Sequence, residues 1–219
     1  MTARSPEVTA VIAAFIAFAI GFALGRYRRY RTRVAVQNRG EALVSYELGK
    51  RFVAPDYHLL NHVTLRLKDE TTQIDHVLVS RFGVFVIETK DYNGWIFADP
   101  GDRHWTQVLY RVKNRFQNPI RQNYRHVCAV QELLDFLPND AIRSVVVFTG
   151  NAEFKTTTPD GVFTLNGLMD YVDGHHAEIM SINRVQFCVG RLETARLSIT
   201  NATDVEHIEG LRRRYGNDE

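Results

Sequence analysis

The sequence has only two cysteines, Cys128 and Cys188, and no Cys-x-x-Cys pair. Structural zinc sites are commonly built from such pairs, so the spacing disfavours a zinc-binding protein. Both cysteines lie among apolar residues, and we expect buried free thiols, which suits a reducing compartment; a disulfide or metal role is the alternative. The chain also lacks internal repeats. Its 219 residues are enough for one domain of ordinary size with a real core.

Most of the chain also lacks an excess of positive charge. The formal net charge is +2, but much of the positive charge lies in one short stretch that contains Arg26, Arg28, Arg29, Arg31 and Arg33. Without these five arginines the chain has a net charge of −3. A module that only binds DNA usually has a strongly basic surface, so the composition disfavours that class. Any contact with nucleic acid must then come from a local patch.

Residues 8–24 form a long apolar run without a charged side chain. As a helix this run would be about 26 Å long, which is just enough to cross a bilayer. The positive charges follow the run, which argues against a cleaved signal peptide; a buried core helix is the other alternative. With the arginines of residues 25–37, the run predicts a single-pass protein of the cell membrane, its N-terminus outside and its body in the cytoplasm. Anionic lipid headgroups would then attract the arginine cluster.

The stretch from residue 73 to residue 90 organises the rest of the chain. Its two apolar segments and central turn predict a β-hairpin that is buried on both faces. Asp75, Glu88 and Lys90 are charged residues within these strands, and burying a charge without a partner is costly. Glu88 and Lys90 share a face because strand side chains alternate. A turn centred near residues 81–82 places Asp75 opposite Glu88, with their Cβ atoms about 5 Å apart.

Two carboxylates this close repel each other, and a divalent cation between them would remove the repulsion. The hairpin therefore predicts a metal or reaction site. A structural cluster of ion pairs is the alternative, although buried ion pairs are poor stabilisers. The prediction depends on the turn, because a slip of one residue in the register would move Asp75 to the other face.

The remaining pattern predicts an α/β fold with a mixed sheet flanked by helices. It consists of a helix, a meander of strands, a second helix, a buried strand and further helices. The expected helices include residues 39–48, 118–137, 166–172, 181–196 and 203–214. The expected strands outside the hairpin are residues 59–67, with the odd-numbered side chains on one face, and residues 95–97, 105–110, 144–149 and 161–165. Trp95 and Trp105 are both expected to lie in the core, and platforms on which nucleic-acid bases stack are the alternative.

Three motifs, in this order, resemble the nuclease-related domain family, NERD. They are Gly40-Glu41, the sequence QIDH at residues 73–76 and the sequence GVFVIETK at residues 83–90. Further residues that match the family pattern are Gly94, Trp105, Gln107, Asn118, Pro119 and Gln122. The resemblance covers residues 38–150, and residues 151–219 would complete the domain. The spacing Asp75-x12-Glu88-x-Lys90 also resembles the PD-(D/E)XK nuclease superfamily.

The resemblance implies a restriction-endonuclease-like core that hydrolyses DNA phosphodiester bonds, with RNA as a second possible substrate. The expected cofactor is Mg²⁺ or Mn²⁺, held by Asp75, Glu88, the Thr89 carbonyl and Glu41, all of them hard oxygen ligands. Lys90 would orient or deprotonate the attacking water or stabilise the transition state, so the expected catalytic residues are Lys90, Asp75 and Glu88.

Gln73, Gln122 and Asn118 are expected to support the site or to contact nucleic acid. For Glu41 a solvated position on the helix is the alternative, and for Gln122 a plain place on the helix surface. The overall hypothesis is a membrane-anchored, metal-dependent nuclease. Its alternative is a catalytically weak or inactive module that binds nucleic acid or protein at the membrane. The sequence identifies no protein partner.

Overall fold

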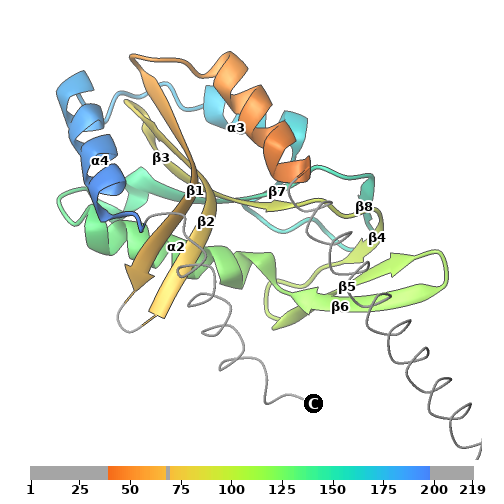
Figure 1. Cartoon of the computed structure of the whole chain (residues 1–219). Coiled ribbons are helices and arrows are strands. Elements are labelled where there is room, and N and C mark those ends of the chain that lie inside the picture. The colour runs from red at the N-terminus through yellow and green to blue at the C-terminus, as the bar shows by residue number, and fades with distance from the viewer. Residues whose placement is uncertain (1–38, 68–69, 198–219) are drawn as a thin grey trace, which may run out of the picture. The chain divides into compact units, whose positions relative to one another are not determined.

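The computed structural model describes residues 39–67 and 70–197 (Figure 1). The chain divides into two units after Arg39, and the fold below is that of the second unit, Gly40–Glu219. The expected membrane helix and basic linker at residues 8–37 and the expected helix at 203–214 lie outside the described residues. No helix in the described ranges is long and apolar enough to cross a membrane.

A five-stranded mixed sheet forms the centre of this unit, with the spatial order β1-β2-β3-β7-β9. The strands are β1 (Tyr57–Leu67), β2 (Glu70–Ser80), β3 (Gly83–Lys90), β7 (Ile142–Phe148) and β9 (Val162–Thr164). β2 pairs antiparallel with β1 and β3, while β7 pairs parallel with β3 and β9. All residues of β3 are buried, which confirms the prediction of a hairpin strand without a solvent face.

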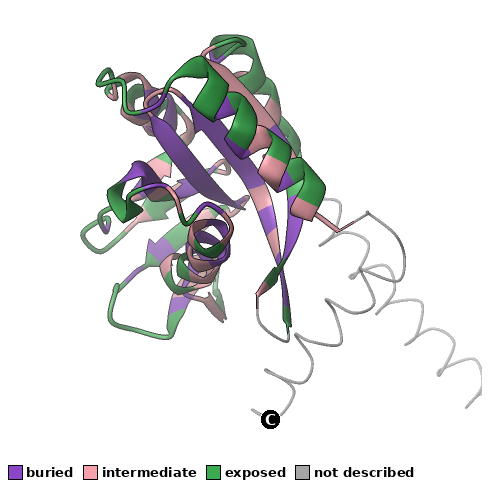
Figure 2. Ribbon diagram, turned by 90° about the vertical axis from the view of Figure 1, so that its left-hand side faces the viewer, coloured by how far each residue is buried: buried purple, intermediate pink, exposed green. Residues whose placement is uncertain are grey.

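Helices cover both faces of this sheet (Figure 1). The first described helix, residues 39–51, and α3 (Leu165–Asp173) pack on one face through an apolar cluster that includes Phe85 and Ile87. α2 (Pro119–Leu133) and α4 (Ile182–Ala195) pack on the other face, against a cluster that includes Val84 and Val86. Figure 2 shows the resulting layers, with buried strands between helices whose outer sides are exposed. A short 3-10 helix, η1 (Asn139–Ala141), precedes β7.

A second, four-stranded sheet has the order β6-β5-β4-β8. Its strands are β4 (Gly94–Phe97), β5 (His104–Leu109), β6 (Val112–Gln117) and β8 (Ala152–Phe154). The α/β class with mixed pairing is confirmed, but the prediction of a single sheet was wrong. The chain leaves the first sheet after β3, and Gly94 adopts a φ of +85° with its backbone packed closely against the Val108 carbonyl. Such a conformation favours glycine and redirects the chain into β4.

Alternation within this second sheet separates the two tryptophans. Trp105 is 1% exposed and faces the core, whereas Trp95 is 48% exposed. The expectation that both lie in the core is thus correct for Trp105 and wrong for Trp95. Short strands with one solvent-facing side bury only every second residue, and the sequence did not show which side that was.

The alternation predicted for β1 is broken at His62, whose φ is 52°. Leu59 contacts the cluster on the face of the first helix, whereas Val63 and Leu65 belong to the cluster beneath α2 and α4. A single residue in the left-handed region changes which side chains face each layer. The neighbouring pairs in the register place His62 opposite Asp75, so the irregularity lies beside the candidate site.

Candidate active site

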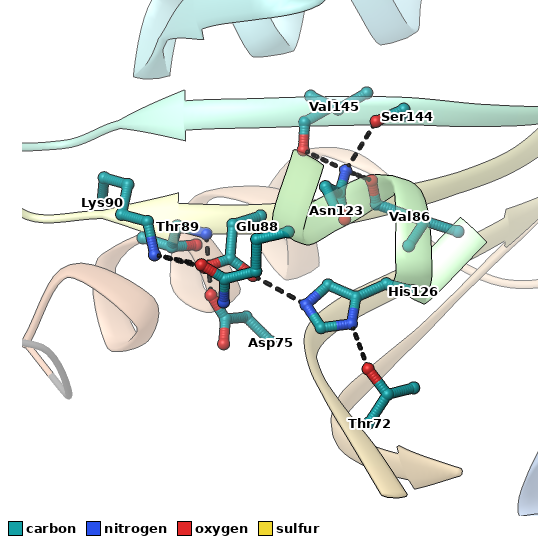
Figure 3. A network of polar contacts seen from close by, with 11 residues as sticks. Thr72, Asp75, Val86, Glu88, Thr89, Lys90, Asn123, His126, Ser144 and Val145 are labelled. Atoms are coloured by element: carbon teal, nitrogen blue, oxygen red, sulfur yellow. Dashed lines mark hydrogen bonds and ion pairs between the residues drawn. The ribbon is translucent and has the colours of Figure 1, made fainter. Parts of the chain in front are cut away.

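Asp75, Glu88 and Lys90 converge at the carboxyl end of β3 (Figure 3). β2 and β3 pair from Ser80 and Gly83 to His76 and Ile87, as predicted from the turn. The next position in this register brings Asp75 beside Glu88. The two carboxyl groups and the ammonium group thus point toward one another from adjacent strands, and the geometric condition for a shared site is met.

Glu88 is held at both of its carboxylate oxygens. Lys90 Nζ donates to Glu88 Oε1 at 2.5 Å, and His126 Nε2 lies 3.0 Å from Glu88 Oε2. The other ring nitrogen of His126, Nδ1, lies 2.7 Å from Thr72 Oγ1. All four residues are buried, and Glu88 itself is only 1% exposed. Contacts from β3 itself and from α2 therefore fix the orientation of this carboxylate, and Thr72 of β2 fixes the histidine ring.

Asp75 lies where β2 separates from β3. The paired residues of these strands end at His76 and Ile87, while β3 continues to pair with β7 as far as Lys90. Asp75 Oδ2 accepts a hydrogen bond from the Thr89 N–H at 2.7 Å. The Asp75 carboxylate thus accepts the hydrogen bond of the Thr89 N–H at a position where β2 and β3 are no longer paired. This buried backbone donor therefore keeps a partner.

Glu41 reaches the site from the first helix and is 8% exposed. One of its oxygens lies 3.5 Å from His62 Nδ1. The preceding residue, Gly40, packs directly against the chain beyond β3, where a Cβ atom would lie 2.6 Å from Thr149 Oγ1 and 2.7 Å from Asp91 Cβ. The absence of a side chain at Gly40 allows this close approach of the helix, and the approach brings Glu41 to the other carboxylates.

The site contains more negative than positive charge. Burial, and then the Glu88 charge, raise the pKa of Glu41 to about 7. Burial, followed by the charges of Glu88 and Glu41, also raises the Asp75 pKa well above its ordinary value. Burial alone would raise the Glu88 pKa, but Lys90 and His126 outweigh it and lower that pKa to about 2. Three carboxylates thus share one close ammonium group, and ionising all of them here is costly.

Lys90 remains a cation in this environment. Burial by itself would lower its pKa, but the negative charges of Glu88 and Asp75 outweigh this effect and raise the pKa above the ordinary lysine value. Gln122 Oε1 accepts a hydrogen bond from Lys90 Nζ at 3.1 Å. The prediction that Gln122 supports the site is consistent with this contact.

The two other predicted supporting residues have different surroundings. Asn118 is completely buried and caps α2 by accepting a hydrogen bond from the Ile120 N–H. Its side-chain amide also donates to the carbonyl of Asp102 at 2.7 Å, so its contacts hold a loop against the helix start. Gln73 is half-buried on β2, opposite Thr64.

His126 and Thr72 were not singled out from the sequence. His126 lies one helical turn after Gln122, and residues at i and i+4 share a helix face. That spacing could have indicated that both point toward β3. Asn123, another buried residue of α2, lies within hydrogen-bonding distance of the Val86 and Val145 carbonyls and the Ser144 hydroxyl, and so connects the helix to β3 and β7. The position of His126 over Glu88 depends on this helix placement.

The side chains have the chemistry that a hard divalent cation requires, although they do not form a complete set of ligands. Among residues 39–67 and 70–197, no three His, Cys, Asp or Glu side chains are arranged to hold a metal ion. Asp75 and Glu41 nevertheless supply carboxylate oxygens, and burial, followed by neighbouring negative charges, raises the pKa of both groups. Mg²⁺ takes only one or two protein carboxylates and keeps several waters, so this donor set fits such an ion.

Comparison with known proteins gives the family. Residues 37–149 match the model of the nuclease-related domain, NERD. An uncharacterized protein of Bacillus anthracis is 43% identical over 97 residues, which cover 44% of this chain and 45% of that relative. The match thus spans less than half the length of the curated relative. No solved structure matches the chain. The family match covers more than half of the sequence and includes Glu41, Asp75, Glu88 and Lys90, and the chain therefore belongs to the nuclease-related domain family.

Proposed function

We propose that this protein is a membrane-anchored nuclease that depends on a divalent metal and hydrolyses DNA phosphodiester bonds at the cytoplasmic face. The observation that carries the proposal is the convergence of Asp75, Glu88 and Lys90 at the end of β3, with Glu41 brought to them by the first helix. Membership of the nuclease-related domain family supports the same class of reaction.

Asp75 and Glu88 would hold Mg²⁺ or Mn²⁺, with the Thr89 carbonyl and Glu41 as further oxygen ligands. When bound, the cation supplies charge neutralisation at the phosphoryl oxygens and lowers the pKa of the attacking water. Asp75 remains anchored to the Thr89 N–H, so its second oxygen is the one available to a ligand. His126 and Lys90 keep Glu88 ionised and oriented.

Lys90 acts in this scheme as a cation. Its pKa is raised by Glu88 and Asp75, so it carries a proton at neutral pH and is not the base that removes one from water. Its ammonium group would instead orient the attacking water by donating a hydrogen bond and would stabilise the negative charge that develops on the phosphoryl oxygens. Gln122 holds the same ammonium group in place.

The test is cleavage of supercoiled plasmid DNA by the full chain in detergent, with Mg²⁺ or Mn²⁺ and with EDTA as the blank. We expect metal-dependent cleavage that Lys90→Ala reduces at least 100-fold, within the range for loss of one transition-state contact. Lys50→Ala, at an exposed lysine of the first helix, is the matched control and should cut normally. Absence of cleavage of DNA or RNA with all divalent metals tried would overturn the proposal.

A second candidate is a binding module with little or no catalysis. The surroundings of Glu88 favour it, because this residue is 1% exposed and its two carboxylate oxygens are already contacted by Lys90 and His126. This function predicts that nucleic acid binds in EDTA with an affinity that Asp75→Asn does not change, and that metal produces no cleavage.

The membrane tether rests on residues 8–24 and the arginines that follow them. In cells, the full chain should sediment with membranes, and a chain that begins at residue 38 should not. A protease added outside intact cells should cut an N-terminal tag and leave the body intact. A body that is digested from outside would contradict the proposed orientation.

A further inference from the structure

The outer face of the second sheet carries exposed aromatic side chains. Trp95 and Phe97 lie two residues apart on β4 and are 48% and 40% exposed, while Ile96 between them is fully buried. Beside them on β5 lie Val108, opposite Trp95, and Thr106, opposite Phe97, both of which are half-buried. These side chains form a partly apolar surface without a covering element in the described part of the chain.

Positive charges flank the aromatic residues on the β6 side, whereas on the β8 side the exposed Glu153 lies opposite Trp95 and pairs with a lysine. On β6, Lys113 lies opposite Val108 and Arg115 lies opposite Thr106, so both cations share the face of Trp95 and Phe97. Both are exposed. Within the described ranges, neither has a carboxylate partner. On the other side of β4, Lys155 Nζ lies 4.8 Å from the centre of the Trp95 ring and also pairs with Glu153. Neighbouring strands are about 4.8 Å apart, so the cations of β6 lie roughly 10 Å from the aromatic column.

The two ends of this face differ in charge. The turn between β5 and β6 carries Tyr110, which is 94% exposed, and the exposed Arg111. At the opposite end, a hollow of about 410 Å³ beside Phe97 is lined in part by Asp99 and Asp102. A polyanion is therefore attracted mainly to the half of the face that lies toward the turn.

We propose that this outer face, with Trp95, Phe97, Lys113 and Arg115 at its centre, binds single-stranded DNA. The proposal deepens the proposed nuclease function and rests on it. Aromatic side chains on an open sheet can stack on bases, and nearby cations can hold the phosphates. In duplex DNA, neighbouring base pairs cover the base faces, so exposed aromatic rings favour a single strand. The near-neutral body is compatible with this assignment, because only a local cluster of cations is needed.

The position of β4 connects this face to the candidate active site. Trp95 follows Lys90 by five residues, so their Cα atoms are at most about 18 Å apart. A strand of several nucleotides is long enough to span this distance. The outer face would thus act as a binding platform that holds substrate near Lys90 without taking part in the reaction.

The first test measures binding of a fluorescein-labelled (dT)20 to the full chain in detergent, by fluorescence anisotropy in EDTA. EDTA prevents cleavage, so this test is independent of metal-dependent activity. Trp95→Ala should weaken binding about 5- to 150-fold, the range for the loss of one base–aromatic stack. Trp95→Phe should stay within about threefold of the parent. Tyr46→Ala, at a 64% exposed aromatic on the first helix, is the matched control and should bind normally.

A second readout follows stacking directly. Trp95 and Trp105 are the two tryptophans of the chain, and Trp105 is buried. In a Trp105→Phe variant, the remaining emission comes from Trp95, and unlabelled (dT)20 should quench it. A chain that binds the oligonucleotide without quenching would contradict stacking on this ring. If Trp105→Phe unfolds the protein, the parent and Trp95→Phe give the same comparison, since only the parent should show the quenching.

The salt dependence tests the cations. Lys113→Gln and Arg115→Gln should each lower the slope of log K against log salt concentration by about 0.7, the value for one phosphate contact with a single strand. Lys50→Gln should leave the slope unchanged.

Three results would overturn the proposal. The first is unchanged affinity for (dT)20 in Trp95→Ala. The second is equally tight binding of a 20-base-pair duplex with the same dependence on Trp95. The third is a loss of affinity in Trp95→Ala that is seen with (U)20 and not with (dT)20, which would assign the face to RNA. If metal-dependent cleavage is absent while Trp95-dependent binding persists, the nuclease proposal fails and the platform remains. If the chain cuts DNA but its binding of (dT)20 does not depend on Trp95, the platform proposal fails and the nuclease proposal remains.

Discussion

At the scale of single residues, the site is defined by carboxylates that the fold brings together at an energetic cost. Asp75 and Glu41 have raised pKa values because burial and neighbouring negative charges disfavour their ionised forms. Glu88 escapes this cost because Lys90 and His126 contact its two oxygens. A protein that gained only stability from these residues would be expected to replace them by apolar side chains, since buried charges are poor stabilisers. The cost of this cluster therefore supports the proposal that it binds a cation.

The first prediction concerns the pH dependence of stability through Glu41. Its folded pKa of about 7 exceeds the ordinary glutamate value of 4.5, so the folded state binds this proton more tightly than the unfolded state. Ionising Glu41 therefore destabilises the folded state, and the contribution of this group to stability falls as the pH rises from 4.5 to about 7. In EDTA, Glu41→Gln should raise the unfolding free energy by up to about 3 kcal/mol at pH 8 and leave it almost unchanged at pH 4.

Denaturant unfolding of the full chain at the two pH values measures this difference. Glu47→Gln, on the same helix, is the matched control and should show no such pH dependence. Equal effects of Glu41→Gln at pH 4 and pH 8 would show that the folded state does not raise the pKa of Glu41 through burial and the nearby Glu88 charge.

The second prediction concerns the contact between His126 and Glu88. His126→Ala removes one partner of a buried carboxylate and also leaves the Thr72 hydroxyl without its ring contact. We expect a loss of about 2–4 kcal/mol in unfolding free energy, because a buried polar group without its partner is costly. Thr72→Val should cost less, about 1 kcal/mol. His176→Ala, at an exposed histidine, is the control and should change the unfolding free energy little. An effect of His126→Ala as small as that of the control would show that His126 does not position Glu88.

At the scale of secondary-structure elements, the site depends on how the first helix and α2 meet the end of β3. The separation of β2 from β3 after His76 leaves room between the strands, where Asp75 contacts the Thr89 N–H. The first helix enters from one face of the sheet, and α2 from the other. Neither approach follows from the amphipathic pattern alone, because that pattern gives the buried side of a helix and not its position along the sheet.

The third prediction compares two glycines of the first helix. Gly40→Ala would place a Cβ atom within 2.7 Å of both Thr149 Oγ1 and Asp91 Cβ, so the helix must shift and Glu41 with it. We expect a loss of about 1–3 kcal/mol in stability, as for overpacking in a core, together with reduced cleavage. A Cβ at Gly49 would meet nothing within 4 Å, so Gly49→Ala should stabilise the helix by up to about 1 kcal/mol. Thermal unfolding of both variants checks the contrast, and a neutral Gly40→Ala would contradict the close approach.

At the scale of the whole molecule, the sequence predicted the parts of the fold that depend on local signals. The turn at residues 81–83, the register that follows from it and the burial of both faces of β3 are all confirmed. The starts of α2 and α4 also agree with their caps at Asn118 and Ser181. These features are encoded by short-range alternation, turn residues and capping residues, which can be read without knowledge of the tertiary structure.

Features that depend on distant contacts could not be predicted in the same way. The second sheet is completed by β8, which lies far along the chain and pairs with β4. The exposure of Trp95 depends on which face of that sheet the core covers. His126 contacts Glu88 across a separation of 38 residues, so its role becomes visible only once α2 is placed on the sheet. The meeting of Asp75 and Glu88 could thus be predicted from the hairpin, whereas the contact of His126 with Glu88 could not.

The fourth prediction tests the central claim, that the carboxylates at the end of β3 form a metal site. The measurement is calorimetric titration of Mn²⁺ into the full chain in detergent at pH 7.5. We predict saturable binding in the parent chain that Asp75→Ala abolishes and that Asp140→Ala, at an exposed aspartate of η1, leaves unchanged. Absence of binding in the parent, or equal binding in the parent and Asp75→Ala, would contradict the account.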